Sequence, residues 1–327
     1  MPQIQLQNIC KSFTVWERPE GRFSVLRGLA RRSKREVRAL DRIGFSIDEG
    51  ELVGYIGPNG AGKSTTVKVM SGILTPEQGE CVILGRTPWK QRSEHVAQIG
   101  VVFGQRSQLW WDVPVSDSFG LLRDIYGIAP AQYRARLSEL TDTLDIGPLL
   151  KTPVRQLSLG QRMRCEVAAS LLHSPRILFL DEPTIGLDAV SKLALRGFLK
   201  RENREHGVTM ILTTHDMDDV EALCDRVMTI GHGRLLFSGT LSALRERFAP
   251  LHRIRVTLYA ATDWLPVPGA ERFEGEGLQG VYWFDSRVIP AHEMVSRLAG
   301  LYPLRDIVVE EQDIDEIIAT MYRELAL

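Results

Sequence analysis

The sequence predicts an α/β protein followed by a small α+β domain. Short apolar runs alternate with helix-like segments from Ile4 to about Phe237, as in a buried parallel sheet. Between about residues 106 and 170 the pattern becomes helical, and past Thr240 shorter alternating strands take over. We therefore expect a domain at 1–240, with a helical subdomain at about 106–170, and a second domain at 241–327.

Four apolar runs mark the expected core strands, at 52–56, 177–180, 209–213 and 227–230. In the second domain, residues 252–260 alternate apolar and polar side chains, and further strands are expected at 280–284 and 306–309. Helices are expected near 292–298 and at the end of the chain. In that last helix Ile314, Ile317, Ile318 and Met321 follow the spacing of one helix face.

Composition narrows the function classes. The net charge of −1 argues against binding of nucleic acid by the chain as a whole. Four distant cysteines with no CxxC pair suit neither a zinc site nor a disulfide framework, and fit a reducing cytosol. No apolar run approaches the roughly 18 residues of a spanning helix, and the first residues lack a signal-peptide profile. We expect a cytoplasmic protein that does not cross a membrane by itself.

Residues 57–64, GPNGAGKS, match the phosphate-loop pattern G-x-x-x-x-G-K-[ST] between an expected strand and a helix-compatible segment at 64–70. The glycines let backbone N–H groups surround phosphates, and the helix N-terminus adds partial positive charge. We expect ATP here, with Lys63 on the β- and γ-phosphates and Ser64 as a ligand of Mg²⁺. The expected nucleotide-binding residues of this loop are Gly57, Pro58, Asn59, Gly60, Ala61, Gly62, Lys63, Ser64 and Thr65.

Two carboxylates follow the apolar run 177–180. A buried strand would deliver Asp181 to the mouth of a cavity, where it can hold Mg²⁺ through water, and Glu182 is placed to polarise an attacking water. Taken alone, this pattern fits an acidic turn equally well. The segment LSLGQ at 157–161 precedes a helix, and His215 ends an apolar strand. In isolation these two features would be a common turn and a structural histidine.

In this order the segments closely resemble the ABC ATPase family over residues 4–238: Walker A loop, Q-loop, signature, Walker B, D-loop and H-switch. The resemblance implies the P-loop NTPase fold, with a RecA-like α/β core, an antiparallel β subdomain and a helical subdomain. It implies Gln105 as the Q-loop glutamine and a Mg²⁺ ligand, with Glu182, His215 and Gln105 as catalytic residues. It also implies nucleotide contacts by Ser158, Gly160 and Gln161 of the signature, by Asp188 of the D-loop and by Phe13, which would stack on adenine.

Three positions depart from the family pattern. Leu159 replaces the first glycine of LSGGQ, and Ile185 replaces the commoner D-loop serine. Phe13 offers a ring without the hydroxyl of the usual tyrosine. None of these changes removes a catalytic group, so we expect a working site.

The family resemblance also implies a mechanism. Two cassettes bind head to tail, and each ATP lies between the Walker A loop of one and the signature of the other. Hydrolysis then opens the pair, and the motion reaches membrane subunits through the Gln105 region. We therefore expect a homodimer or a paired cassette.

The stretches 104–128 and 161–188 resemble ABC-2 type exporters of drugs, viologens or antibiotics. That resemblance implies two integral-membrane permeases, usually distinct, and contact with the inner face of the membrane. Trp110 and Trp111 fall where the family docks its permease, although both also fit a helical-subdomain core. The alternative is a stand-alone regulatory or translation-associated ABC ATPase. The transported molecule contacts the permeases in this family, so no residue here identifies it.

Residues 16–38 form a basic insertion with eight basic and three acidic side chains. One interpretation is a basic amphipathic helix, with Phe23, Leu26 and Leu29 on its apolar stripe, against anionic lipid or the permease. The other is a solvated loop, because Gly21 and Gly28 weaken a helix.

Overall fold

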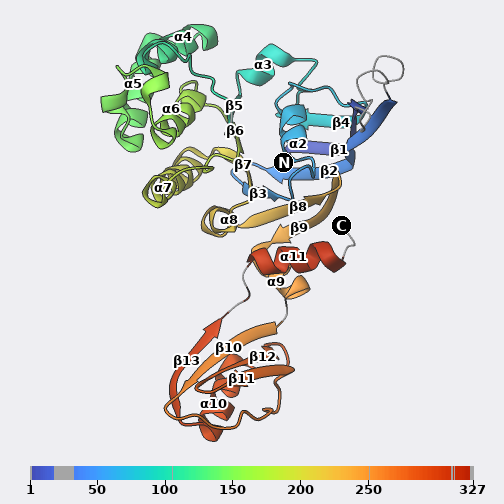
Figure 1. Ribbon diagram of the computed structural model, residues 1–327. Coiled ribbons are helices and arrows are strands. Elements are labelled where there is room, and N and C mark those ends of the chain that lie inside the picture. Colours follow the sequence, from blue (N-terminus) through green and yellow to red (C-terminus); the bar gives the residue numbers. More distant parts are fainter. Residues whose placement is uncertain are drawn as a thin grey trace, which may run out of the picture. The chain divides into compact units, whose positions relative to one another are not determined.

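The structure is a computed structural model that describes residues 2–17, 33–104, 106–249, 251–310, 312 and 314–324. The chain divides into two compact units, residues 1–238 and 239–327 (Figure 1). No helix among the described residues is both long enough and apolar enough to cross a bilayer.

A six-stranded sheet forms the centre of the first unit. Its strands, in spatial order, are β5 (Ile99–Phe103), β6 (Ile177–Asp181), β7 (Thr209–Thr214), β3 (Leu52–Ile56), β8 (Arg226–Gly231) and β9 (Arg234–Thr240). The strands from β5 to β8 pair in parallel, and β3 and β7 are buried along their whole length. Burial on both faces explains the unbroken apolar runs of the sequence. The four predicted core strands are all present.

Helices pack on this sheet. They are α2 (Lys63–Met70), α3 (Arg92–Val96), α7 (Ala189–His206) and α8 (Met217–Leu223). α2 contacts β6, α3 contacts β5, and α8 contacts β3 and β7. α2 follows β3 directly, so the loop between them lies at the carboxyl end of the parallel strands, where α/β proteins bind ligands.

A second, antiparallel sheet has the order β2–β1–β4, with β1 (Pro2–Glu17), β2 (Ser33–Asp48) and β4 (Gln78–Ile83). Strands β1 and β2 extend into the expected insertion 16–38 from both sides, because Trp16 and Glu17 pair with Lys34 and Ser33. The remainder of that segment, residues 18–32, lies outside the described residues, and with it the proposed amphipathic helix.

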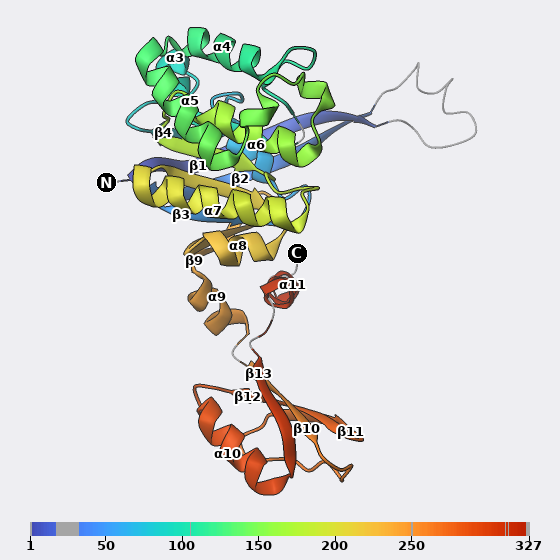
Figure 2. The ribbon, with the colours of Figure 1, turned by 90° about the vertical axis from the view of Figure 1, so that its left-hand side faces the viewer.

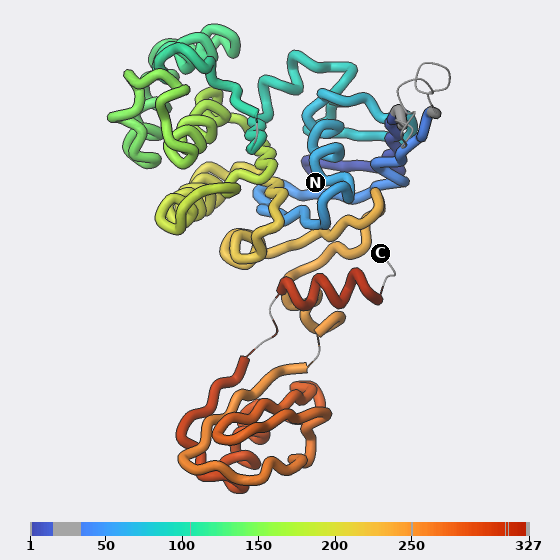
Figure 3. Tube along the Cα trace, viewed as in Figure 1, coloured from blue at the N-terminus to red at the C-terminus, as the bar shows by residue number. Residues whose placement is uncertain are grey.

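Three helices fill most of the stretch expected to be helical: α4 (Val115–Tyr126), α5 (Pro130–Leu144) and α6 (Leu159–Leu171). α6 contacts α4, α5 and β5, and α5 also contacts α7. Figures 2 and 3 show α4, α5 and α6 gathered as one lobe beside the sheet. The parallel core, antiparallel sheet and helical lobe are the predicted P-loop ABC ATPase fold.

The second unit contains α9 (Leu241–Phe248), β10 (Leu251–Leu258), β11 (Arg272–Glu276), β12 (Gln279–Asp285), α10 (Ala291–Leu301), β13 (Leu304–Glu310) and α11 (Ile314–Glu324). The strands pair antiparallel in the order β11–β12–β10–β13. Ile254, Tyr282 and Phe284 pack with Met294 and Leu298 of α10 in its core. This is the predicted α+β arrangement, with α9 and β11 as elements that the sequence pattern did not reveal.

Candidate nucleotide-binding site

The phosphate loop runs from the end of β3 into α2. Gly62 occupies the N-cap position of α2 with φ 111°, a conformation that side chains rarely adopt. A Cβ on Gly62 would lie 2.6 Å from the carbonyl oxygen of Ala39, so only glycine fits. No side chain caps the N-terminus of α2. Its first backbone N–H groups are therefore available to an anionic ligand.

Lys63 is held inside this loop. Its side chain is nearly buried, and Nζ donates hydrogen bonds to the carbonyl oxygens of Gly57 at 2.6 Å and Pro58 at 3.3 Å. Burial lowers the pKa of Lys63, while the carboxylates of Glu182 and Asp181 raise it. The cation thus lies between the loop and the two acidic groups, where it can contact a phosphate.

Asp181, at the end of β6, faces the phosphate loop. Its Oδ1 accepts hydrogen bonds from the Ser64 hydroxyl at 3.1 Å and from Thr213 Oγ1 at 2.5 Å. The backbone N–H of Gly104 donates to the Asp181 carbonyl at 2.7 Å. A carboxylate and a hydroxyl within 3.1 Å form an oxygen-only donor set of the kind Mg²⁺ prefers, so Ser64 and Asp181 fit that ion. Gln105, the third predicted ligand, lies outside the described residues.

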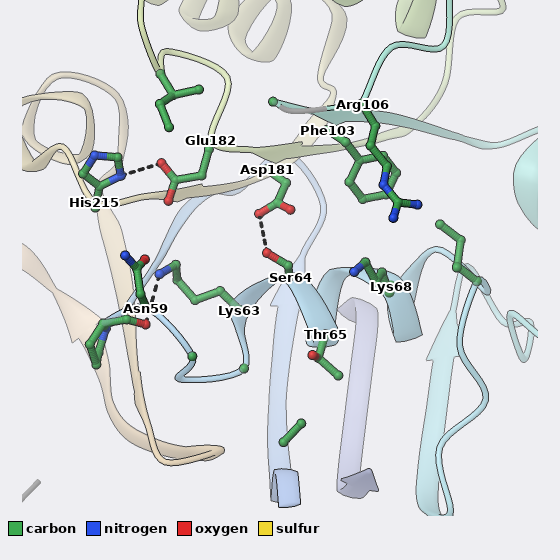
Figure 4. Close-up of a pocket in the computed structure, with 17 residues that line it drawn as sticks. Asn59, Lys63, Ser64, Thr65, Lys68, Phe103, Arg106, Asp181, Glu182 and His215 are labelled. Atoms are coloured by element: carbon green, nitrogen blue, oxygen red, sulfur yellow. Dashed lines mark hydrogen bonds and ion pairs between the residues drawn. The ribbon is translucent and has the colours of Figure 1, made fainter. Parts of the chain in front are cut away.

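Glu182 and His215 meet across the ends of β6 and β7. His215 Nδ1 lies 2.7 Å from Glu182 Oε2, and the Glu182 backbone N–H donates to the Thr213 carbonyl at 2.9 Å. Glu182 has φ 57°, in the left-handed region that costs a non-glycine residue free energy. The strained backbone turns this carboxylate toward the cavity and toward the histidine (Figure 4).

These groups line one cavity of about 580 Å³, which is large enough for a nucleotide phosphate chain. It brings together the predicted Pro58, Asn59, Gly60, Gly62, Lys63, Ser64, Thr65, Asp181, Glu182 and His215. The other seven lining residues were not predicted: Ala39, Lys68, Ile73, Phe103, Gly104, Arg106 and Ile185. Lys68 is four residues after Ser64 on α2, so helical spacing could have found it. Ala39 belongs to no motif.

Phe13 does not line this cavity. It lies exposed on β1 and pairs with Val37, which is two residues from the cavity-lining Ala39. Its stacking on adenine therefore stays a prediction. The Phe13 ring lies on the β1–β2 strand pair, which also carries the cavity-lining Ala39.

The signature residues stand at the N-terminus of α6, and none of them lines the cavity of the same chain. Ser158 caps α6: its Oγ accepts the Gln161 N–H at 3.2 Å, and Gln161 Oε1 accepts the Ser158 N–H at 2.9 Å. The Gln161 side chain is thus engaged in a capping box. The Leu159 side chain lies so close to Gly186 that a Cβ on Gly186 would sit 2.5 Å from Leu159 Cδ2.

The D-loop lies between the nucleotide cavity and the signature residues. Asp188 caps α7 by accepting the Ser191 N–H at 2.9 Å, and hydrogen bonds from Ser191 lower the pKa of Asp188. Asp188 does not line the cavity, but Ile185, three residues earlier, does. The D-loop therefore reaches from the nucleotide cavity to the signature, where Gly186 meets Leu159.

A phosphate loop with a magnesium-type carboxylate, a base-type carboxylate and a histidine at the ends of adjacent parallel strands defines a P-loop ATPase. The ABC transporter family profile matches residues 40–185. The chain is 33% identical over 213 residues to the ABC transporter ATP-binding protein NatA of Bacillus subtilis, covering 65% of this chain and 86% of NatA.

Other comparisons agree. The probable multidrug ABC transporter ATP-binding protein YbhF of Escherichia coli is 35% identical over 213 residues, 64% of this chain and 36% of YbhF. The methionine import ATP-binding protein MetN of Bordetella pertussis is 33% identical over 265 residues, 79% of this chain and 67% of MetN. A dimeric post-hydrolysis structure of the cassette MJ0796, bound to ADP and Pi, superposes with a TM-score of 0.61 at 25% identity, covering 73% and 98% of the chains. The chain belongs to the ABC transporter ATP-binding proteins and is an ATPase.

Proposed function

We propose that this chain is the ATP-hydrolysing subunit of an ABC-2 type exporter. It acts as a pair in the cytoplasm, at the inner face of the membrane, with two distinct integral-membrane permeases. The observation that carries the proposal is the split site: the chain gathers Lys63, Asp181, Glu182 and His215 in one cavity, while Ser158 and Gly160 lie outside it. The multidrug relative supports the direction of transport.

The phosphates of ATP enter the cavity at the N-terminus of α2. Backbone N–H groups of the loop and the Lys63 ammonium bind the β- and γ-phosphates. Ser64, Asp181 and Gln105 would hold Mg²⁺, which would supply positive charge to the phosphate oxygens. Thr213 keeps Asp181 in place by its hydrogen bond to Oδ1. Phe13 stacks on the adenine at the edge formed by β1 and β2.

Glu182 accepts a proton from the attacking water, and His215 orients its carboxylate across 2.7 Å. The second chain supplies Ser158 and Gly160 to the γ-phosphate, with its own helix α6 directed at that group. The Ser158 hydroxyl has an exposed position at the helix end, where it can also contact a ligand. Asp188 and Ile185 lie between the paired sites. ATP thus favours the closed pair over the open one.

The permeases dock on residues near Trp110 and Trp111. The two side chains are 42% and 52% exposed, which is unusual for tryptophan and typical of contact surfaces. This exposure weighs against the alternative that both belong to the subdomain core. The basic segment within 16–38 would add contact with anionic lipid or the permease. Substrate recognition falls to the permeases.

Glu182→Gln tests the assignment of the base. We expect the variant to bind ATP, to lose hydrolysis by about 10²–10⁴-fold and to accumulate as a dimer in ATP. Binding is measured with a fluorescent ATP analogue, turnover by phosphate release and dimer formation by light scattering. Because the active form is proposed to be a pair of chains, wild-type ATPase activity should rise more than proportionally with protein concentration. Near-normal turnover of the variant would remove Glu182 from the role of base.

The direction of transport needs a cellular test. When the chain is expressed together with its permeases in a sensitive host, resistance to some members of an antibiotic panel should rise, and Glu182→Gln should abolish this rise. A panel without any such difference would contradict the exporter.

An importer is the second candidate, and one observation favours it. The match to MetN covers 79% of this chain, more than the first unit alone, so it extends into residues past 238. Uptake of radiolabelled methionine by cells expressing the same proteins separates the two. ATP-dependent accumulation that Glu182→Gln abolishes would support the importer.

A further inference from the structure

One face of α6 holds the segment that follows Gln105. Arg162 and Glu166 lie four residues apart on this helix and therefore share a face. The Glu166 carboxylate, only 4% exposed, accepts hydrogen bonds from the Ser107 hydroxyl and from the backbone N–H of Gln108 at 3.1 Å. Gln108 Nε2 in turn donates to the backbone carbonyl of Glu166 at 2.9 Å.

The rest of the segment is held by a bond within itself, by α4 and by α6. The Leu109 N–H donates to Ser107 Oγ at 3.1 Å, and the Trp110 N–H donates to Ser118 Oγ at 3.1 Å. The Arg162 guanidinium lies over the Trp111 ring at 5.8 Å from its centroid, a cation–π distance. Residues 107–111 thus contact α6 at both ends, while Trp110 between them is also bonded to Ser118 of α4.

A buried carboxylate is costly unless its partners are in place. Burial raises the pKa of Glu166, and hydrogen bonds from Ser107 and Gln108 oppose that effect. The neighbouring Met163, Cys165 and Val167 of α6 are buried as apolar side chains. A carboxylate at such a position stabilises this arrangement of the segment, because Ser107 and Gln108 supply the hydrogen bonds that the buried group needs.

We propose that Glu166 is a positioning residue that ties residues 107–111 to the helix carrying Ser158 and Gly160, so that the two move together. Glu166 lies eight residues from Ser158, about 12 Å along one helix. The segment carries Trp110 and Trp111, so the link rests on the proposed function in one respect: that the membrane partner contacts these side chains. A displacement of the tryptophans by the membrane partner then moves α6, and with it the signature residues that complete the partner chain's ATP site.

Hydrogen exchange on the full chain tests the link without any permease. The parent is Glu182→Gln, with and without ATP, and the measured peptides cover residues 57–65 and 107–111. In the parent we expect ATP to slow exchange in both peptides. Adding Glu166→Ala should keep the response at 57–65 and reduce the response at 107–111 by about two- to thirty-fold. Glu166→Gln retains an acceptor oxygen and should restore part of it.

Glu202→Gln is the matched control. Glu202 is a carboxylate of α7, 3% exposed, that pairs with Arg136 rather than with the segment. It should match Glu166→Ala in lowering the melting temperature while leaving the response at 107–111 intact. A response at 107–111 that persists in Glu166→Ala, or that is absent from the parent, overturns the proposal.

Permease-stimulated ATPase activity separates the link from the docking surface. If Trp110→Ala and Trp111→Ala leave stimulation unchanged while Glu166→Ala loses the exchange response, the docking surface is wrong and the link is supported. If both tryptophan variants lose stimulation and Glu166→Ala keeps the exchange response, the docking surface stands and the link is wrong.

Discussion

Two helices of the first unit begin at nucleotide-related motifs, and their N-termini are capped differently. α2 begins at Gly62 with no side-chain cap, and its first turn lines the cavity with Lys63 and Ser64. α6 begins at Ser158 with a closed capping box, and its first turn lies outside that cavity. Both ends carry the partial positive charge of a helix dipole.

The difference matches two proposed roles: α2 binds the nucleotide within one chain, and α6 completes the nucleotide site of the partner chain. The end of α2 leaves its backbone N–H groups available, so it suits an anion that binds within one chain. At the end of α6 the capping box satisfies the Gln161 N–H, so this end is capped while the chain is alone. Under the proposed pairing, a γ-phosphate reaches this helix end only when a second chain brings one. The contrast predicts different consequences for substitutions at the two ends.

The largest effect is expected at α2. Lys63→Met removes the charge that lies between the loop and the two carboxylates, and kcat for ATP hydrolysis should fall by about 10²–10³-fold. Nucleotide binding by the isolated chain should weaken as well, measured by titration with a fluorescent ATP analogue. Unchanged binding would break the comparison, because the end of α2 would then not be the binding end.

A pH effect is expected at the far end of α6. His173 Nε2–H donates to the Ile99 carbonyl at 2.9 Å, its ring stacks on Tyr126 at 3.9 Å, and burial lowers the pKa of His173 to about 4. Buried Nδ1 has no partner among the described residues, so a second proton there is unfavourable. The folded state binds this proton less readily than the unfolded state. Stability should therefore be intact above about pH 6.5 and fall as the pH drops toward 4.

The loss attributable to His173 should be on the order of 2 kcal/mol in the free energy of unfolding. Urea titrations at pH 7 and pH 5 measure it, and His173→Gln, which does not titrate, should show a smaller difference between the two. Equal differences in both proteins would show that His173 does not anchor α6 in this way.

Ser158→Ala removes the cap of α6 and the hydroxyl that we propose contacts the partner chain's nucleotide. Stability should fall by about 1 kcal/mol. ATPase activity should fall further than that loss explains, while nucleotide binding by the single chain stays normal. Thr240→Ala is the matched control, because Thr240 caps α9 in the second unit by accepting the Ala243 N–H at 3.1 Å. The control should lose stability alone, and equal activity losses in both would contradict the role of Ser158.

The smallest effect is expected at Leu159. Leu159→Ala shortens the side chain that lies on Gly186, and the half-exposed contact should contribute only about 0.5 kcal/mol. Gly186→Ala should cost more, because its φ of 70° disfavours a Cβ and that Cβ would meet Leu159. Part of the cost should vanish when both changes are combined, as measured by a double-mutant cycle in urea. Strict additivity would show that the two residues do not interact.

The sequence predicted the parts of the site that depend on local order. Residues 57–64 match a sequence pattern that is contained within one segment. Asp181 and Glu182 follow the apolar run 177–180, so a buried strand there places both at its carboxyl end. Both assignments follow from apolar runs and motif chemistry within one segment. His215 was instead implied by the family resemblance, and it meets Glu182 because β6 and β7 are neighbouring strands.

Residues that act through contacts between distant segments were not found. Thr213 reaches Asp181 only because β6 and β7 are neighbours, and Ala39 enters the cavity from the antiparallel sheet. Glu166 resembles any acidic residue of a helix until Ser107 and Gln108 are packed against it. The short α9 and the exposed strand β11 have too few apolar positions for a clear period.

At Glu182 the left-handed backbone lowers the stability of the fold, while the side chain is the proposed base of ATP hydrolysis. A glycine there would relieve about 1–2 kcal/mol of conformational free energy and remove the carboxylate. Given the proposed role of Glu182 as the base, Glu182→Gly should fold more stably, still bind ATP and no longer hydrolyse it. A pair of one such chain with one active chain would retain a single working site.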